Sequence, residues 1–181
     1  SRMASIHFVT STSALARLSH LGYRNVHLVG NPGYDYIHNA PWRSGRPLPE
    51  PYVVVNYQPE TLDGTNEISS IIASLPKDLF QVFIYPNPDR GSDEIAATIK
   101  RYVGEHPKRI AYDWLPHGEY LNLIAHCEEL IGNSSSMLYE APELGIRTRM
   151  IGKRQRGRTI PWGGGGLASE RICHILKCVV L

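Results

Sequence analysis

Two patterns of hydrophobic and polar positions alternate along most of the chain. Short apolar runs recur between longer segments with helical spacing, and the runs at residues 53–55 and 82–84 contain no polar residue. Continuous apolar runs are typical of strands that are buried on both faces of a sheet. The predicted strands are residues 52–57, 81–85, 109–112, 129–131 and 148–151, and the predicted helices are about 66–75, 92–103, 119–127 and 135–144. This alternation predicts an α/β fold, a Rossmann-like parallel sheet with helices on both faces.

The segment before residue 52 has a different pattern. It predicts a strand at 6–10, a helix at 14–21 between Ser11 or Ser13 and Gly22, a second strand at 26–30 and a turn at 31–33. Residues 40–51 contain four prolines and two arginines, which favours an extended linker. The predicted organisation is an N-terminal segment at 1–38, a Pro-rich linker at 39–51, a Rossmann-like domain at 52–158, and a Gly-rich connection with a C-terminal helix at 159–181.

Composition narrows the class of protein. The 19 Lys and Arg residues against 17 Asp and Glu give a net charge of +2, so no strong field favours nucleic acid as a partner. Three cysteines without a CxxC pair indicate free thiols in a reducing compartment, hence a cytoplasmic protein. No apolar run approaches the roughly 20 residues that cross a bilayer, and the first residues lack the apolar core of a signal peptide. We therefore expect no membrane association.

A hydroxyl-rich turn follows the predicted strand at 129–131. Ser134, Ser135 and Ser136 stand where a helix is predicted to begin, and free N–H groups and hydroxyls at such a position bind anions. Glu140 would lie about 8 Å farther along the helix axis, roughly the distance from a diphosphate to its ribose. A helix carboxylate is more commonly solvated, so Glu140 alone does not decide the matter. Pro142 requires this helix to be short or bent.

The next predicted strand leads into a basic loop. Residues 153–158 carry four cations, including Arg154 and Arg158. Such a loop is ordinarily a solvated surface or a weak nucleic-acid patch. The carboxyl ends of parallel strands meet at one edge of a sheet, so this loop is expected beside the serines, where guanidinium groups bind phosphate oxygens. We expect Arg154 to be the first choice for this role.

Polar residues also follow two other predicted strands. Gln58, Glu60 and Thr61 follow the strand at 52–57, and Asn87, Asp89 and Arg90 follow the strand at 81–85. These positions are at the edge where open α/β sheets bind ligands. The alternative is ordinary turn chemistry, with Thr61 capping the next helix. The eight histidines show no HxxxH or HExxH spacing, so we expect no metal site; His117, at a helix start, has no assigned role.

Five motifs in this order resemble one enzyme family. They are residues 30–35, 58–61, 85–94, 131–136 with Glu140 to Pro142, and 152–158. Together, over about residues 6–158, the chain resembles the hydrolysing UDP-N-acetylglucosamine 2-epimerases of the sialic-acid-precursor type. The resemblance implies two Rossmann-like domains in the glycosyltransferase-B arrangement, with UDP held mainly by the second and the sugar in the cleft between them.

The resemblance also implies a reaction and a set of UDP ligands. The family removes the C2 proton of the sugar and expels UDP, giving N-acetylmannosamine and UDP, and we expect neither a cofactor nor a metal. Ser134 and Ser135 would contact the diphosphate, Glu140 the ribose and Arg154 a phosphate. The full set of implied UDP-binding residues is Gln58, Asn87, Ser134, Ser135, Ser136, Glu140, Arg154 and Arg158.

Two departures from the family pattern bear on activity. Gln58 stands where the family usually has a histidine that helps to bind the leaving diphosphate, and glutamine cannot carry charge or move protons. Residues 1–38 resemble the end of a first domain whose acid and base carboxylates are missing from this chain. We therefore expect no catalytic residue here, and a UDP-sugar-binding half that is inactive alone. The alternatives are the donor-binding domain of a UDP-sugar glycosyltransferase and a non-catalytic nucleotide-sugar-binding module.

The strands at 6–10 and 26–30 would then lack their own sheet. Unpaired strand edges invite pairing with another chain. We therefore expect a homo-oligomer, or pairing with a chain that carries the missing domain, in addition to UDP or UDP-N-acetylglucosamine as the small-molecule partner.

Overall fold

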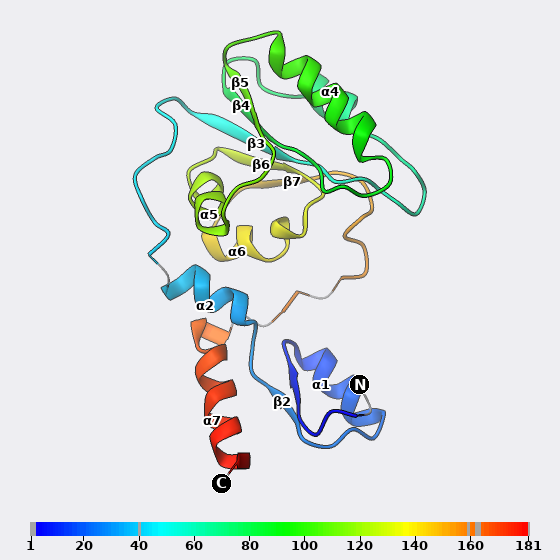
Figure 1. Ribbon diagram of the computed structural model, residues 1–181, viewed down its shortest axis with the longest axis vertical. Coiled ribbons are helices and arrows are strands. Elements are labelled where there is room, and N and C mark those ends of the chain that lie inside the picture. Colours follow the sequence, from blue (N-terminus) through cyan, green and yellow to red (C-terminus); the bar gives the residue numbers. More distant parts are fainter. Residues whose placement is uncertain (1–2, 40, 159, 162–163, 181) are drawn as a thin grey trace. The chain divides into compact units, whose positions relative to one another are not determined.

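The computed structural model describes residues 3–39, 41–158, 160–161 and 164–180, and its chain divides into two compact units (Figure 1). The larger unit is Trp42–Gly157, and the smaller unit combines Ser1–Pro41 with Arg158–Leu181. The tail thus groups with the N-terminal segment rather than standing apart. Residues 159 and 162–163 of the predicted Gly-rich connection lie outside the described residues.

Within the described residues, the larger unit contains a five-stranded parallel sheet with the order β5-β4-β3-β6-β7. Its strands are β3 (Tyr52–Asn56), β4 (Phe80–Ile84), β5 (Arg109–Tyr112), β6 (Glu129–Gly132) and β7 (Thr148–Met150). The chain adds β4 and β5 on one side of β3, then crosses over to add β6 and β7 on the other. This reversal makes the carboxyl ends of β3 and β6 the topological switch point, where ligands of open α/β sheets bind.

Helices cover both faces of this sheet, as the alternating pattern predicts. They are α3 (Ile68–Ala73), α4 (Ser92–Gly104), α5 (His117–Ala125) and α6 (Glu140–Leu144). Figure 1 shows α4 on one face, and α5 and α6 on the other. The Rossmann-like α/β fold predicted from the sequence is therefore confirmed.

The core is built on β3, whose five residues are all buried. Alternate side chains of a strand point to opposite faces. On one face Val53 and Val55 pack with Ile71 of α3 and Ile99 of α4. On the other, the hydroxyl of Tyr52 donates to the carbonyl of Leu123 in α5 at 2.7 Å. The apolar run is thus explained by a strand that has helices on both sides.

The predicted helix at 135–144 is interrupted. The structure has a 3-10 turn, η1 (Ser135–Met137), and then the short helix α6, which ends at Gly145 in the left-handed conformation with φ +66°. Pro142 lacks the N–H that a continuous helix needs at this position, and its ring would clash with the preceding turn. The helix therefore restarts at Glu140 and is short, as expected from Pro142.

Other helix ends also differ from the predictions. The helix α3 begins at Ile68, with Glu67 rather than Thr61 at its N-cap, so the alternative in which Thr61 caps this helix is contradicted. Thr61 lies exposed in a turn instead. The helix α5 begins at His117, which the sequence indicates as a helix start, rather than at about residue 119, and Pro116 occupies its N-cap position.

The smaller unit holds a parallel strand pair, β1 (His7–Val9) and β2 (Val26–Leu28). Its helices are α1 (Thr12–His20), α2 (Pro32–Asn39) and α7 (Ala168–Val180), with a 3-10 turn, η2 (Gly164–Gly166). The two strands pair with each other, so within the described residues each keeps one edge without a partner strand. The self-association expected from such edges stays a prediction.

The helix α2 was not predicted, because the sequence indicates a turn at 31–33. Pro32 takes the first helical position, where its missing N–H is no loss. Asn31 Oδ1 accepts the N–H of Gly33 at 3.0 Å, and Tyr34 and Ile37 are buried one turn apart. Asp35 of α2 accepts the N–H groups of Ala168 and Ser169 at 3.0 and 2.6 Å, and so caps the start of α7.

Ion pairs lie along the β6–β7 edge of the sheet. Arg149 of β7 donates to Glu129 of β6 at 2.9 Å, and Arg147 lies 3.5 Å from the same carboxylate. Among the residues that the structure describes, no helix is both long and apolar enough to cross a membrane.

The close approach of β6 to β3 at Gly132 generates a stability prediction. Gly132 ends β6 with φ +139°, and a Cβ atom there would overlap the carbonyl oxygen of Asn56 and lie 2.6 Å from its carbon. Gly132→Ala should lower the free energy of unfolding by about 2–5 kcal/mol, combining backbone strain and overpacking. Urea unfolding followed by circular dichroism measures it.

Gly145→Ala is the matched control. Gly145 also has positive φ, at +66°, but a Cβ atom there meets nothing within 4 Å. It should lower the free energy of unfolding by only about 1–2 kcal/mol. Equal losses at the two positions would show that the contact between β6 and Asn56 is not as tight as described.

Candidate functional site

A cavity of about 280 Å³ lies at the carboxyl ends of the strands of the larger unit. Its walls come from β3 and β4 and from the loops and helices that follow β3, β4, β5, β6 and β7, so the cavity lies at the switch point of the sheet. The lining residues are Asn56, Gln58, Ile84, Tyr85, Asn87, Asp113, Trp114, Leu115, His117, Tyr120, Ser134, Ser135, Ser136, Glu140 and Arg154.

Most of the site residues expected from the sequence meet in this cavity. Those that line it are Gln58, Asn87, Ser134, Ser135, Ser136, Glu140 and Arg154. Arg158 does not line it; this residue is exposed and belongs to the smaller unit. A phosphate role for Arg158 stays a prediction.

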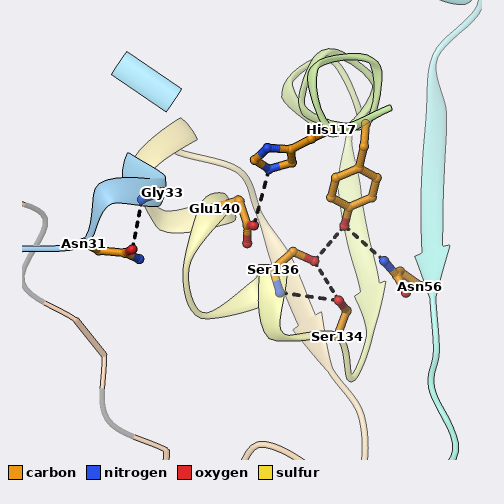
Figure 2. Close-up of polar contacts among 8 residues, drawn as sticks. Asn31, Gly33, Asn56, His117, Ser134, Ser136 and Glu140 are labelled. Carbon is orange, nitrogen blue, oxygen red and sulfur yellow. Dashed lines mark hydrogen bonds and ion pairs between the residues drawn. The ribbon is translucent and has the colours of Figure 1, made fainter. Parts of the chain in front are cut away.

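The serine turn is held by its own hydroxyls. Ser134 Oγ accepts the Ser136 hydroxyl at 2.9 Å and the Ser136 N–H at 3.4 Å (Figure 2). Ser136 Oγ lies 2.6 Å from the hydroxyl of Tyr120 in α5. Because η1 has only three residues, little helix dipole is available here, and the hydroxyls rather than a long helix provide the polar groups of the turn.

Asn133 connects this turn to the loop after β3. Its side chain accepts the N–H of Gln58 at 2.6 Å and donates to the Gln58 carbonyl at 2.8 Å, while its own surface is fully buried. Gln155, also buried, donates from Nε2 to the carbonyl of Asn133 at 2.6 Å. The serine turn, the loop after β3 and the basic loop are thus joined through one asparagine.

The basic loop presents Arg154 to the cavity. Glu60 is buried and its Oε1 accepts the N–H of Lys153 at 2.8 Å, which anchors the loop together with Gln155. Arg154 is half-buried, whereas Arg156 is exposed and does not line the cavity. Among the described lining residues, Arg154 alone carries a permanent positive charge.

Glu140 faces the same cavity with an unusual carboxylate. Its Oε1 lies 3.8 Å from His117 Nε2 (Figure 2), and its buried Oε2 has no hydrogen-bond partner. Burial raises the pKa of Glu140 above its ordinary value, and a backbone hydrogen bond and His117 only partly oppose this. A buried oxygen without a donor is an acceptor that a ligand hydroxyl can satisfy.

Other residues that the sequence places at the edge of the sheet do not line the cavity. Glu60 serves as a loop anchor, and Asp89 and Arg90 lie exposed in a turn, in which Ser92 donates to the carbonyl of Asp89 at 3.0 Å. For Asp89 and Arg90 the alternative reading of ordinary turn chemistry describes the structure.

Eight lining residues have no role assigned from the sequence, namely Asn56, Ile84, Tyr85, Asp113, Trp114, Leu115, His117 and Tyr120. Trp114 and His117 follow β5 and could have been found by the strand-end rule that selected Gln58 and Asn87. Asn56 and Tyr120 carry no such signal, because Tyr120 reaches the serine turn only through tertiary packing. Burial raises the pKa of Tyr120 to about 12. Among the residues that the structure describes, no group of three or more His, Cys, Asp or Glu side chains could hold a metal ion.

Comparisons with known proteins agree with the motif pattern. Residues 1–162 match the family model described as UDP-N-acetylglucosamine 2-epimerase. The chain is 26% identical over 172 residues to the UDP-N-acetylglucosamine 2-epimerase of Neisseria meningitidis serogroup B, covering 87% of this chain and 45% of that protein. It is 38% identical over 113 residues to polysialic acid biosynthesis protein P7 of Escherichia coli, covering 59% and 29%. The chain therefore spans about half the length, or less, of these relatives.

A solved structure shows the same fold. The UDP-GlcNAc 2-epimerase of Methanocaldococcus jannaschii, crystallised in complex with UDP-GlcNAc and UDP, matches 97% of this chain and 62% of its own length with a TM-score of 0.65. The identity is 15%, so this likeness speaks for the fold alone. Because the family model matches residues 1–162 of 181, the chain belongs to the UDP-N-acetylglucosamine 2-epimerase family.

Proposed function

We propose that the chain is the UDP-sugar-binding half of a UDP-N-acetylglucosamine 2-epimerase, and that the cavity of the larger unit holds the UDP part of the substrate. One observation carries the proposal. Serine hydroxyls, one arginine and the half-buried Glu140 carboxylate converge in a single cavity at the switch point. A nucleoside diphosphate needs hydrogen-bond donors and positive charge for its phosphates, and an acceptor for its ribose hydroxyls.

Each part of UDP has a counterpart in the cavity. The Arg154 guanidinium binds phosphate oxygens in a bidentate manner, and the hydroxyls of Ser134 and Ser135 donate to the same group. Glu140 lines the cavity and accepts hydrogen bonds from the ribose hydroxyls. Gln58 and Asn87 line the same wall of the cavity.

The same groups suit the departure of UDP in the family reaction. Negative charge grows on the leaving diphosphate as the bond to the sugar breaks, and preorganised donors and a cation stabilise that charge. We propose that this chain supplies this half of catalysis without cofactor or metal. The acid and base for the sugar C2 proton belong, by the resemblance, to a first domain, and the chain spans 45% of the Neisseria relative.

The first prediction from this proposal concerns charge in the cavity. Arg154→Ala should weaken UDP binding by about tenfold to a hundredfold, because a charge-assisted hydrogen-bonded contact to phosphate is lost. Isothermal titration calorimetry with UDP measures the dissociation constant. Arg156→Ala is the matched control, two residues away, exposed and outside the cavity; it should change the constant less than about twofold. Equal effects would remove Arg154 from the site.

A second prediction separates stability from binding at Glu140. A carboxyl whose folded pKa is raised contributes stability at low pH that is lost as pH rises through the folded pKa. Glutamine does not ionise, so Glu140→Gln avoids this loss of stability. At pH 7 the variant should therefore unfold at a higher urea concentration than the wild type. It should also bind UDP about tenfold more weakly, because a charged acceptor for ribose is gone. A variant that is less stable at pH 7, or that binds UDP equally well, would contradict the assignment.

The third prediction concerns turnover by the chain alone. Purified chain incubated with UDP-N-acetylglucosamine should release no N-acetylmannosamine above a buffer blank, while binding of UDP remains measurable by calorimetry. Chromatography detects any N-acetylmannosamine that is released, and a coupled assay detects free UDP. Release of both products would show that the chain carries its own acid and base.

A further inference from the structure

A continuous series of hydrogen bonds crosses the cavity wall from the loop after β4 to the serine turn. Asn87 N lies 2.8 Å from Gln58 Oε1, Gln58 Nε2 lies 2.9 Å from Asn56 Oδ1, and Asn56 Nδ2 lies 3.1 Å from the Tyr120 hydroxyl. The series continues from Tyr120 to Ser136 at 2.6 Å and from Ser136 to Ser134 at 2.9 Å. We call these residues, Asn87, Gln58, Asn56, Tyr120, Ser136 and Ser134, the polar relay.

The direction of the first bonds is decided by a backbone group. The N–H of Asn87 can only donate, so the atom of Gln58 that faces it must be the carbonyl oxygen. The amide nitrogen of Gln58 then faces Asn56 and donates, which makes the facing atom of Asn56 its oxygen. The amide nitrogen of Asn56 is left to donate to the hydroxyl oxygen of Tyr120.

The hydroxyls transmit this direction to the end of the relay (Figure 2). Tyr120 accepts from Asn56, and because the one proton of Ser136 is donated to Ser134, the proton of Tyr120 goes to Ser136 Oγ. The proton of Ser136 then goes to Ser134 Oγ, which also accepts the Ser136 N–H. Ser134 therefore accepts two hydrogen bonds, and its own proton is left for a group in the cavity that it lines.

The middle of the relay is mostly buried. Asn56, Gln58 and Ser136 are all buried. Burial raises the pKa of Tyr120 to about 12, so its hydroxyl keeps its proton at physiological pH. If the Gln58 amide turned over, its nitrogen would face the N–H of Asn87 and its oxygen would face the oxygen of Asn56, and such unpaired groups are costly where they are buried.

We propose that Gln58, Asn56 and Tyr120 are positioning residues that fix the polarity of the relay and make Ser134 an obligate hydrogen-bond donor. The proposal rests on the proposed function, in which a nucleoside diphosphate occupies the cavity. A site with this polarity selects oxygen acceptors such as an ionised diphosphate. Gln58 thereby acts on the ligand through Ser134, across three intervening side chains.

An isosteric change at the start of the relay should reverse it. In Gln58→Glu, measured at pH 8 where the carboxylate is ionised, neither oxygen can donate to Asn56. The Asn56 amide must then turn over, Tyr120 donates to Asn56, Ser136 donates to Tyr120, and Ser134 donates to Ser136 instead of to the ligand. The dissociation constant for UDP should rise about tenfold to a hundredfold, the loss of a charge-assisted hydrogen bond. Binding of uridine, which has no phosphate, should change less than about threefold.

The new charge in Gln58→Glu also repels a diphosphate, and a double-mutant cycle separates this effect from the relay. Tyr120→Phe removes the hydroxyl that links Asn56 to Ser136. In that background Gln58→Glu should weaken UDP binding only about threefold, by charge alone, so the two single changes should be coupled by a factor of about three or more. Calorimetry with UDP, and nuclear magnetic resonance titration with uridine, provide the constants.

The outcomes distinguish the two proposals. A wild-type chain that fails to bind UDP at millimolar concentration overturns the proposed function. A wild-type chain that binds UDP, with Gln58→Glu equally harmful in both backgrounds, overturns the relay alone. If Gln58→Glu does not fold, Gln58→Met takes its place, because a thioether leaves the orientation of Asn56 undefined. UDP binding should then weaken about threefold or more with uridine binding unchanged, and an unchanged UDP constant would overturn the relay.

Discussion

The cavity depends on the hydrogen bonds of Asn133. This fully buried residue uses its side chain to pair with both backbone groups of Gln58, its N–H to bond the carbonyl of Asn56, and its carbonyl to receive Gln155. Each of these partners lies on a segment that lines or anchors the cavity. Gly132, just before it, lets β6 approach Asn56 closely enough for the pairing. The position of the serine turn is therefore set by buried hydrogen bonds that join it to β3, to the loop after β3 and to the basic loop.

This arrangement explains why the position of the candidate site in the fold could be predicted from the sequence, whereas the contacts within it could not. Apolar runs such as 53–55 predict buried parallel strands, and the strand-end rule then brings Gln58, Asn87, the serines and Arg154 to one edge. Pro142 indicates that the helix after the serines is short. The rule is topological, so it brings these residues to one edge of the sheet, but it does not decide which of them line the cavity, as Glu60, Asp89 and Arg90 show.

The rest of the site depends on tertiary distances that no local pattern carries. Tyr120 lies within a helix and faces the serines only because α5 packs on the sheet, and His117 meets Glu140 from a different segment. The helix α2 was not predicted, because Asn31, Pro32 and Gly33 indicate a turn. Its buried residues Tyr34 and Ile37 form an apolar face that becomes apparent only in the structure. Arg158 shares its motif with Arg154 but not its place in the fold, since the division between the two units falls just before it.

The cap that Asp35 provides for α7 has a consequence for how the chain folds. The contact joins residues 133 positions apart in the sequence, and closing so long a loop is entropically expensive and slow. The larger unit is one continuous segment, and all of it precedes α7 along the chain. During synthesis from the N-terminus, the Rossmann-like sheet can therefore assemble first. The smaller unit can be completed only after α7 has left the ribosome.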